Sequence, residues 1–288
     1  MAEIGSGQRL PGGLYFISTP IGAARDITLR ALDLLRDAEV IAAEDTRSLR
    51  HLMDIHGVAL GGRPLLSYHD HNGEQMRPRL LDALKDGKSV VYASEAGTPL
   101  VADPGYQLGA AAIAAGHPVT AAPGPSAALA ALTVSGLPSD RFLFAGFAPN
   151  GSGPRRRWLA DLKATPATLI LYESPKRLKA LLTDMAEVMG GGRRAVVCRE
   201  LTKKFEEVLR GTVADLAAAF ADREARGEIV VLIDRPGATV VTPADIEAAL
   251  REALTCQSVK DAAATVAAAT GAPRREVYQM ALKLAAKD

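Results

Sequence analysis

The sequence of 288 residues lacks the features that mark secreted, membrane-bound or zinc-dependent proteins. Its two cysteines, Cys198 and Cys256, are too few for a zinc ligand set and suggest no disulfide framework. No apolar run reaches the ~18 residues of a membrane-spanning helix, and no charged-then-apolar signal pattern opens the chain. We therefore expect a soluble, cytoplasmic protein that has no membrane partner.

A strong charge of either sign is also missing. The 34 Lys and Arg residues nearly balance the 33 Asp and Glu residues, which leaves a formal net charge of +1. A protein that holds RNA by charge alone is usually far more basic, so RNA binding would require local basic patches. The candidate patches, each of which is more often simply a solvated surface run, are 155–157, 193–194, 203–204 and 274–275.

The common ligand-binding and catalytic signatures are absent as well. The sequence contains no GxGxxG after its first apolar run, no GxxxxGK[ST], no GxSxG and no HExxH. These absences argue against the usual dinucleotide loop, the P-loop, the hydrolase nucleophile elbow and the zinc-protease helix. Any cofactor must therefore be bound by an unusual set of loops.

What the sequence does contain is a regular alternation of short apolar runs and helix-like segments in its first half. The expected strands are 14–18, 40–43, 65–68, 89–93 and 118–121, and polar or Gly/Pro-rich loops follow them. This order is typical of a wound α/β domain, whose ligands lie beyond the carboxyl ends of the strands. The 48% hydrophobic content is enough for a sizeable core.

The chain is expected to divide into four segments. A flexible Gly-rich tail is expected at 1–13, and an N-terminal α/β domain at 14–148 ends with a strand at 142–147. A C-terminal α/β domain with a mixed sheet follows at 149–236, and its Pro- and Gly-rich start is interpreted as an interdomain linker. Residues 237–288 are expected to be helical, either as a helix-turn-helix-like module or as a tail that packs on the body.

Three loops, 19–22, 94–99 and 123–126, combine glycine, proline and small hydroxyl residues directly after expected strands. Glycine permits unusual backbone angles, and small side chains let a ligand approach the backbone closely. One such loop is weak support for a binding site because tight turns are common. Three in one domain predict a ligand cleft at the ends of the strands.

These loops belong to an ordered series of motifs. The motifs are found at 18–22, 26–28, 43–47, 69–72, 94–99, 103–105, 123–127, 136–140, 172–174, 199–203 and 227–228. Together they resemble the 16S ribosomal RNA cytidine 2′-O-methyltransferases, the RsmI family, a branch of the tetrapyrrole methylase superfamily. The resemblance spans about residues 14–234, and so many motifs in the same order make it highly specific.

The resemblance implies a two-domain tetrapyrrole-methylase (class III methyltransferase) fold, here followed by the C-terminal helical module. It implies S-adenosylmethionine as the cofactor, bound in the cleft between the domains, and no metal. The implied reaction is 2′-O-methylation of a cytidine ribose in the decoding region of 16S ribosomal RNA. The implied partners are the small ribosomal subunit and a second copy of the chain in a homodimer.

The resemblance also assigns residues to the cofactor, whose methionine and adenosine parts would be held by loop backbones. The cofactor residues are Pro20, Gly22, Ser94, Glu95, Ala96, Gly97, Thr98, Pro123, Gly124, Pro125, Ser126 and Ala127. Two positions depart from the family pattern, because Ala23 stands where Asn is usual and Glu95 where Asp is usual. The structural alternative for each single glycine or proline is a tight turn.

Candidates for the chemistry lie in the polar loops. Glu44 could orient the ribose or take its proton, Arg47 could hold phosphate, and Asp45 and His69 are further catalytic candidates. An ion pair that orders the 44–47 loop is the alternative, and metal binding around His69 is a minor one. The expected RNA contacts are Arg155, Arg156, Arg157, Arg199 and Lys203, with a clamp of Arg and Glu between domains as the competing account of the last two.

Two rival functions remain open at this stage. A tetrapyrrole methyltransferase would share the fold, but such enzymes typically open with a G-x-G-P-G-D loop that this chain lacks. A non-catalytic RNA-binding or ribosome-assembly protein would keep the fold without the reaction, and Ala23 and Glu95 are the only hints in that direction.

Overall fold

The computed structural model describes residues 10–101, 105–237, 243–270 and 272–285. The chain forms two compact units, 1–235 and 236–288. The predicted tail lies outside the described residues over 1–9. Leu10, however, is buried in the core, and the first strand already begins at Gly13.

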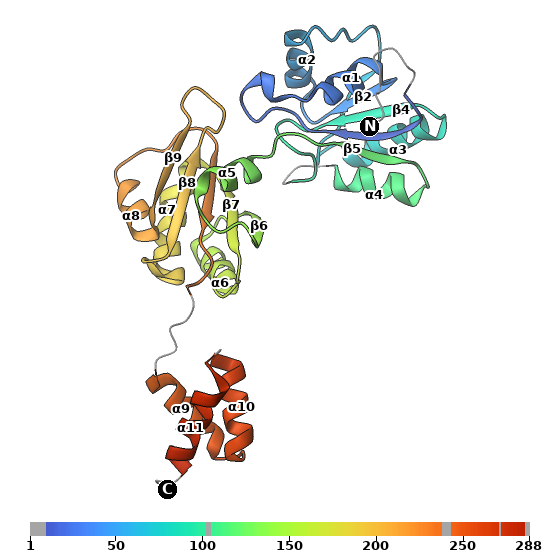
Figure 1. The fold of residues 1–288 in the computed structure, drawn as a ribbon. Coiled ribbons are helices and arrows are strands. Elements are labelled where there is room, and N and C mark those ends of the chain that lie inside the picture. Colours follow the sequence, from blue (N-terminus) through green and yellow to red (C-terminus); the bar gives the residue numbers. More distant parts are fainter. Residues whose placement is uncertain (1–9, 102–104, 238–242, 271, 286–288) are drawn as a thin grey trace. The chain divides into compact units, whose positions relative to one another are not determined.

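The first layer is a parallel sheet of five strands in the order β3-β2-β4-β1-β5 (Figure 1). Its strands are β1 (Gly13–Ile17), β2 (Val40–Ala43), β3 (Leu65–Ser67), β4 (Ser89–Ala93) and β5 (Val119–Ala122). The connecting helices are η1 (Ala24–Asp26), α1 (Leu29–Asp37), α2 (Thr46–Ile55), α3 (Gly73–Lys85) and α4 (Tyr106–Ala114). This confirms the predicted wound α/β arrangement.

Both faces of this sheet are covered by helices, which explains why its strands are almost entirely apolar. On one face Ile17 and Ile41 pack in a cluster with Leu34 of α1 and Met53 of α2. Residues of α3 and α4 cover the other face. The loops that follow the strands are therefore held at one edge by a packed core.

The second layer is a mixed sheet in the order β6-β7-β10-β8-β9. Its strands are β6 (Phe142–Phe147), β7 (Thr168–Glu173), β8 (Arg194–Arg199), β9 (Glu207–Thr212) and β10 (Ile229–Ile233). Helix α5 (Ala127–Ser135) packs on one face with Cys198 and Val230. The other face carries α6 (Ser152–Leu162), α7 (Pro175–Met185), the π-helical turn η2 (Ala186–Gly190) and α8 (Val213–Ala219).

The predicted position of the boundary between the layers needs correction. The strand at 142–147 was expected to end the first domain, but β6 pairs in parallel with β7 of the second sheet. Helix α5 also packs on that sheet, so the chain changes layers in the loop 123–126. An apolar run predicts a buried strand but does not reveal which sheet the strand joins.

The second unit consists of α9 (Pro243–Leu254), α10 (Val259–Thr270) and α11 (Arg274–Ala285). Leu250, Val266 and Val277 pack together in a core of its own. The Ser258 side chain accepts a hydrogen bond from the backbone N–H of Asp261 at 3.2 Å, as expected for a helix cap. In the part of the chain that the structure describes, no helix has the length and apolar character to span a bilayer.

Candidate active site

The three Gly/Pro-rich loops meet at the carboxyl edge of the first sheet. Thr19 and Gly97 exchange two backbone hydrogen bonds of 3.0 Å, and the Thr19 hydroxyl donates to the carbonyl of Ser94 at 3.2 Å. The Thr98 hydroxyl donates to the carbonyl of Pro125 at 2.8 Å. Gly97 has a φ of +84°, which a side chain would make unfavourable. The loops therefore form one connected backbone surface.

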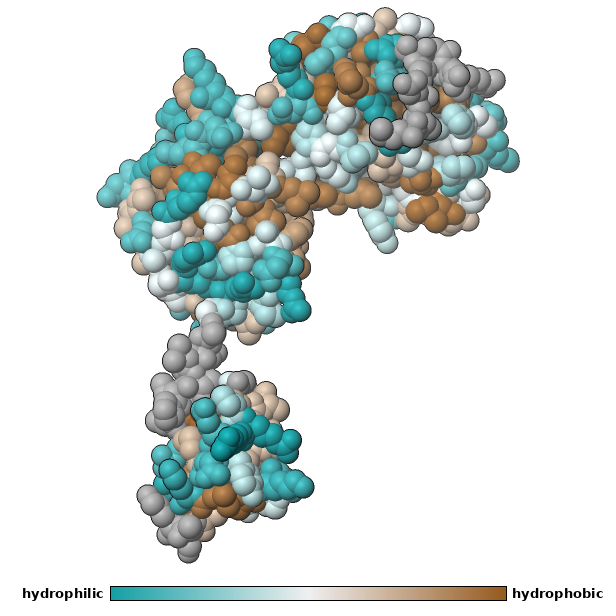
Figure 2. Space-filling view, in the orientation of Figure 1, coloured by the Kyte–Doolittle hydropathy of each residue, from teal (hydrophilic) through white to brown (hydrophobic). Residues whose placement is uncertain are grey.

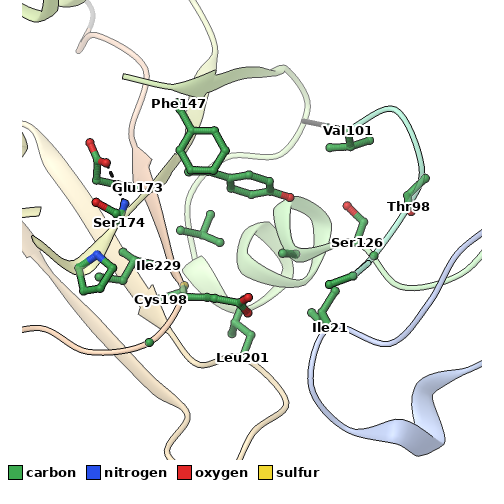
Figure 3. Close-up of a pocket in the computed structure, with 18 residues that line it drawn as sticks. Ile21, Thr98, Val101, Ser126, Phe147, Glu173, Ser174, Cys198, Leu201 and Ile229 are labelled. Carbon is green, nitrogen blue, oxygen red and sulfur yellow. Dashed lines mark hydrogen bonds between the residues drawn. The ribbon is translucent and has the colours of Figure 1, made fainter. Parts of the chain in front are cut away.

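A cavity of about 330 Å³ opens beside these loops and extends to the second sheet. Figure 3 shows Ile21 and Ser126 on one side of it and Cys198 on the other. The lining residues are Ile21, Ala96, Gly97, Thr98, Val101, Ser126, Ala127, Phe147, Tyr172, Glu173, Ser174, Pro175, Cys198, Leu201, Gly227, Glu228, Ile229 and Val230.

The expected cofactor residues divide into two groups in this geometry. Those that line the cavity are Ala96, Gly97, Thr98, Ser126 and Ala127. The others, Pro20, Gly22, Ser94, Glu95, Pro123, Gly124 and Pro125, are not in the lining. Several of these support the loops; for example, the Ser94 hydroxyl donates to the carbonyl of Gly97 at 2.7 Å.

The wall contributed by the second sheet is mainly apolar. The ring of Tyr172 stands edge-on to Phe144 and Phe147, with centroids 4.8 and 5.7 Å away. Its hydroxyl accepts a hydrogen bond from the backbone N–H of Ala128 at 3.2 Å, which joins β7 to the start of α5. Burial raises the pKa of the Cys198 thiol to about 12, so this side chain stays protonated and serves as an apolar surface.

Carboxylates gather around Glu95, the residue that precedes Ala96 of the cavity lining. The backbone N–H of Glu95 donates to Glu44 Oε2 at 3.3 Å, so the loops after β2 and β4 lie together. Glu95 is exposed, but partial desolvation raises its pKa, and the neighbouring charges of Glu44, Asp45 and Glu228 raise it further. Glu95 is thus a carboxyl group whose proton affinity exceeds that of an ordinary glutamate.

Asp45 and Arg47, both catalytic candidates, have local structural roles. Asp45 Oδ1 accepts hydrogen bonds from the backbone N–H groups of Arg47 (2.7 Å) and Ser48 (3.3 Å), which makes Asp45 the N-cap of α2. The Arg47 side chain is 92% exposed and lies 3.4 Å from Asp45 Oδ2. This is the loop-ordering ion pair that the sequence left open, although the Arg47 guanidinium still faces solvent.

Replacing Asp45 with alanine should lower the free energy of unfolding by about 1 kcal/mol, because α2 loses its cap. Backbone N–H donors lower the pKa of Asp45 in the folded chain. The stabilisation should therefore be present above the ordinary Asp pKa and disappear as the pH falls through the lowered value. Urea unfolding as a function of pH measures this, with Asp45→Asn as the variant that keeps the cap. Equal loss in both variants would assign the effect to charge instead.

His69 lies in a separate polar cavity of about 280 Å³, beside the starts of α3 and α4. Tyr68, Asp70, Glu74 and Arg77 are among its lining residues. The Nδ1 atom of His69 is buried and has no hydrogen-bond partner among the described residues. Within the described residues, no group of three or more His, Cys, Asp or Glu side chains is arranged to hold a metal ion.

The prediction that Arg155 contacts RNA is wrong. Arg155 is 4% exposed, and its guanidinium bonds to Asp184 with N–O distances of 2.6 and 2.7 Å. The three arginines lie on helix α6, not on a linker. Of these three consecutive helical positions, Arg155 is the one that faces the core. Arg156 pairs with Glu187 at the surface, and Arg157 is exposed.

Replacing Asp184 with alanine should destabilise the chain by about 3–5 kcal/mol, because the Arg155 charge would remain buried without a partner. Denaturant unfolding measures the loss. The matched control is Glu187→Ala, which breaks the exposed pair with Arg156 and should cost less than about 1 kcal/mol. Similar losses in the two variants would mean that the Arg155 pair is solvated in solution.

Arg199 and Lys203 are also engaged in ion pairs. Arg199 Nε lies 3.1 Å from Glu207, and Lys203 Nζ lies 3.0 Å from Glu200 and 2.8 Å from Glu228. The Lys203 interactions raise its pKa despite partial burial. These pairs lie within the second layer and hold the loop between β8 and β9.

Comparisons with known proteins define the class of this site. Residues 13–217 match the model of the Tetrapyrrole (Corrin/Porphyrin) Methylases, and residues 240–285 match the RsmI C-terminal HTH domain. Among solved structures, the methyltransferase CobJ is similar with a TM-score of 0.61 at 19% identity, covering 78% of this chain and 94% of that one. Cobalt precorrin-4 methyltransferase CbiF gives a TM-score of 0.58 at 23% identity, over 77% and 94% of the two chains. The chain therefore belongs to the tetrapyrrole methylase family.

Curated relatives specify the branch. The chain is 48% identical to ribosomal RNA small subunit methyltransferase I of Mesorhizobium japonicum, over 96% of this chain and 93% of the relative. Identity to the protein of the same name is 45% in Xylella fastidiosa (93% and 98% covered) and 42% in Mycobacterium tuberculosis (94% and 95% covered). The chain belongs to the family of ribosomal RNA small subunit methyltransferase I, which confirms the resemblance found in the sequence. It is a methyltransferase with S-adenosylmethionine as methyl donor.

The cavity fits this cofactor. Its volume lies in the range of about 300–1,000 Å³ that is usual for small-molecule sites. Apolar side chains such as Leu201 and Ile229 in the lining suit the adenosine. The lining residues of the second layer were only partly anticipated. Those that lie in motifs shared with the family, but were not assigned to the cofactor, are Tyr172, Glu173, Ser174, Leu201, Gly227 and Glu228.

Proposed function

We propose that the chain transfers a methyl group from S-adenosylmethionine to the ribose 2′-hydroxyl of a cytidine in the decoding region of 16S ribosomal RNA. The observation that carries the proposal is the cavity at the Gly/Pro loops, in a chain related over nearly its whole length to ribosomal RNA small subunit methyltransferase I. We assign to this chain the ribosomal RNA substrate that the name of those relatives states, and not a tetrapyrrole. With this substrate the chain would act in the cytoplasm.

The cofactor would be held by Ala96, Gly97, Thr98, Ser126 and Ala127 on one side and by the apolar wall of the second sheet on the other. When bound, S-adenosylmethionine supplies a methyl group on a sulfonium, which is already an excellent leaving group. The main contribution of the protein is then to orient the acceptor, and orientation alone is worth several kcal/mol.

A ribose 2′-hydroxyl is a weak acid, so a nearby base should help to take its proton. We assign this role to the carboxylate of Glu95, with Glu44 as the group that holds its loop and raises its pKa. Arg47, exposed near Glu44 in the chain, would bind a backbone phosphate of the RNA. His69 would contact RNA through the neighbouring polar cavity.

Further RNA contacts would come from basic residues that remain exposed. Arg157 on α6 and Arg274 and Arg275 at the start of α11 meet this condition. The last two lie in the part of the chain that matches the HTH domain. Each would contribute to affinity through phosphate neutralisation, and would therefore add to its salt dependence.

A homodimer is the proposed assembly. Strand β6 is an edge strand, yet its Phe142 and Leu143 are 46% and 37% exposed, and Leu129 of the neighbouring α5 is 51% exposed. Hydrophobic surface is visible over α5 in Figure 2. Exposed apolar edges of this kind are normally covered by a partner, and here the partner is a second copy.

Sedimentation velocity should show a dimer in the wild type. The double substitution Phe142→Glu with Leu143→Glu should convert it to a monomer, because it places charge on the apolar edge. A monomeric wild type would refute the assignment.

The test of the reaction uses the full chain with labelled S-adenosylmethionine and small ribosomal subunits from cells that lack the modification. Nuclease digestion should place the label on the ribose of one cytidine in the decoding region. Label on a base would refute the 2′-O assignment. No label on any RNA would refute the proposed RNA substrate.

A further inference from the structure

The loop 200–206 between β8 and β9 presents an aromatic side chain to solvent beside the cofactor cavity. Leu201, near the start of the loop, lines the cavity. Phe205, four residues later, is 63% exposed. The ammonium group of Lys204 lies 5.5 Å from the centroid of the Phe205 ring. A large aromatic ring and a cation thus stand together at a tip of the second layer.

The backbone that carries this pair is held in an unusual conformation. Glu200 and Thr202 have φ angles of +53° and +63°, which residues other than glycine rarely adopt. Glu206 fixes the turn because its Oε2 accepts a 2.6 Å hydrogen bond from the backbone N–H of Thr202. Lys203 bonds to Glu200 across the turn. Strained backbone that the surroundings hold in place is typical of functional sites.

The same loop is attached to the first layer. The backbone N–H of Ala23 donates to the Thr202 hydroxyl at 3.0 Å. Gly22 fits so closely that a Cβ there would lie 2.5 Å from Lys203 Cγ and 2.6 Å from Thr202 Oγ1. The loop is therefore held against the first layer, with Leu201 in the cavity lining and Phe205 exposed four residues further along the chain.

We propose that Phe205 and Lys204 form a stacking platform for an unpaired base of the RNA substrate, next to the nucleotide that is methylated. Single-stranded RNA is recognised by aromatic rings that stack on bases and by cations that track the backbone. The exposed Phe205 ring offers a face on which a base can stack, and the ammonium of Lys204 beside it can meet a phosphate. A stable protein contact needs about 800 Å² on each partner, whereas Phe205 is a single exposed ring on this loop. The inference rests on the proposed RNA substrate.

The test compares Phe205→Ala and Phe205→Trp with the wild type in methylation of small ribosomal subunits. Loss of one stacked base should raise KM for the RNA about 5- to 150-fold in the alanine variant. The tryptophan variant should keep the KM of the wild type, because a larger ring stacks at least as well. Affinity for S-adenosylmethionine should be unchanged in both, since Phe205 does not line the cavity. The matched control is Ile113→Ala, another exposed apolar residue, 65% exposed on α4.

The possible outcomes separate the two proposals. An active wild type with unchanged KM for RNA in Phe205→Ala would overturn the platform and leave the function intact. An inactive wild type on every RNA would overturn the function itself. A change in sedimentation caused by Phe205→Ala would assign the ring to a contact between copies of the chain, which also overturns the platform. A KM for RNA as high in Phe205→Trp as in Phe205→Ala would assign a structural role to Phe205, and would also overturn the platform.

Discussion

Replacing Ala96 with tryptophan is expected to weaken S-adenosylmethionine binding at least ~100-fold, or about 3 kcal/mol. Ala96 lines the cavity, and it is exposed. Its neighbour Gly97 is fixed by two backbone hydrogen bonds to Thr19, so the loop has little freedom to move a larger side chain aside. The indole would occupy the space that the cofactor needs, without disturbing the core of either layer.

Isothermal titration calorimetry with S-adenosylmethionine measures the loss directly. The matched control is Ala114→Trp, the same substitution at an exposed alanine at the end of α4, outside the cavity lining. Its affinity should equal that of the wild type, and both variants should unfold at the same urea concentration. Wild-type affinity in Ala96→Trp would place the cofactor elsewhere.

The cavity also shows how far the sequence alone could lead. Glycine and proline after apolar runs identify three loops in the sequence, namely 19–22, 94–99 and 123–126. The structure brings these loops together. The opposite wall carries no such sign. Cys198 and Val230 are ordinary strand residues in sequence, and only the crossing of the chain into a second sheet turns them toward the cavity.

Side-chain partners explain the remaining differences. Arg155 and Arg157 are indistinguishable in an arginine run, yet burial against Asp184 removes only the first from solvent. Likewise, β6 has the composition of a buried strand, but its position at the sheet edge leaves Phe142 exposed. Both outcomes depend on contacts between segments distant in the chain, which local patterns do not contain.

Glu95→Gln is expected to lower kcat for methyl transfer by ~10²–10⁴ at neutral pH, the usual contribution of a well-placed general base. Cofactor affinity should change little, because Glu95 is not in the cavity lining. Glu95→Asp, the residue usual in the family, keeps the charge and should retain most of the rate. Equal losses in both variants would indicate that side-chain length matters, and would argue for a positioning role.

The pH dependence separates a base from a structural carboxylate. Partial desolvation and nearby carboxylates raise the pKa of Glu95, and activity requires the ionised form, so kcat should rise with pH through a value above that of an ordinary glutamate. Glu44→Gln removes one of the repelling charges and should therefore move this acid limb to lower pH, although only in part, because partial desolvation is the larger cause. Single-turnover rates measured from acid to neutral pH give the acid limb of the wild type and that of Glu44→Gln. Loss of the acid limb in Glu44→Gln, combined with a rate as low as that of Glu95→Gln, would identify Glu44 as the base instead.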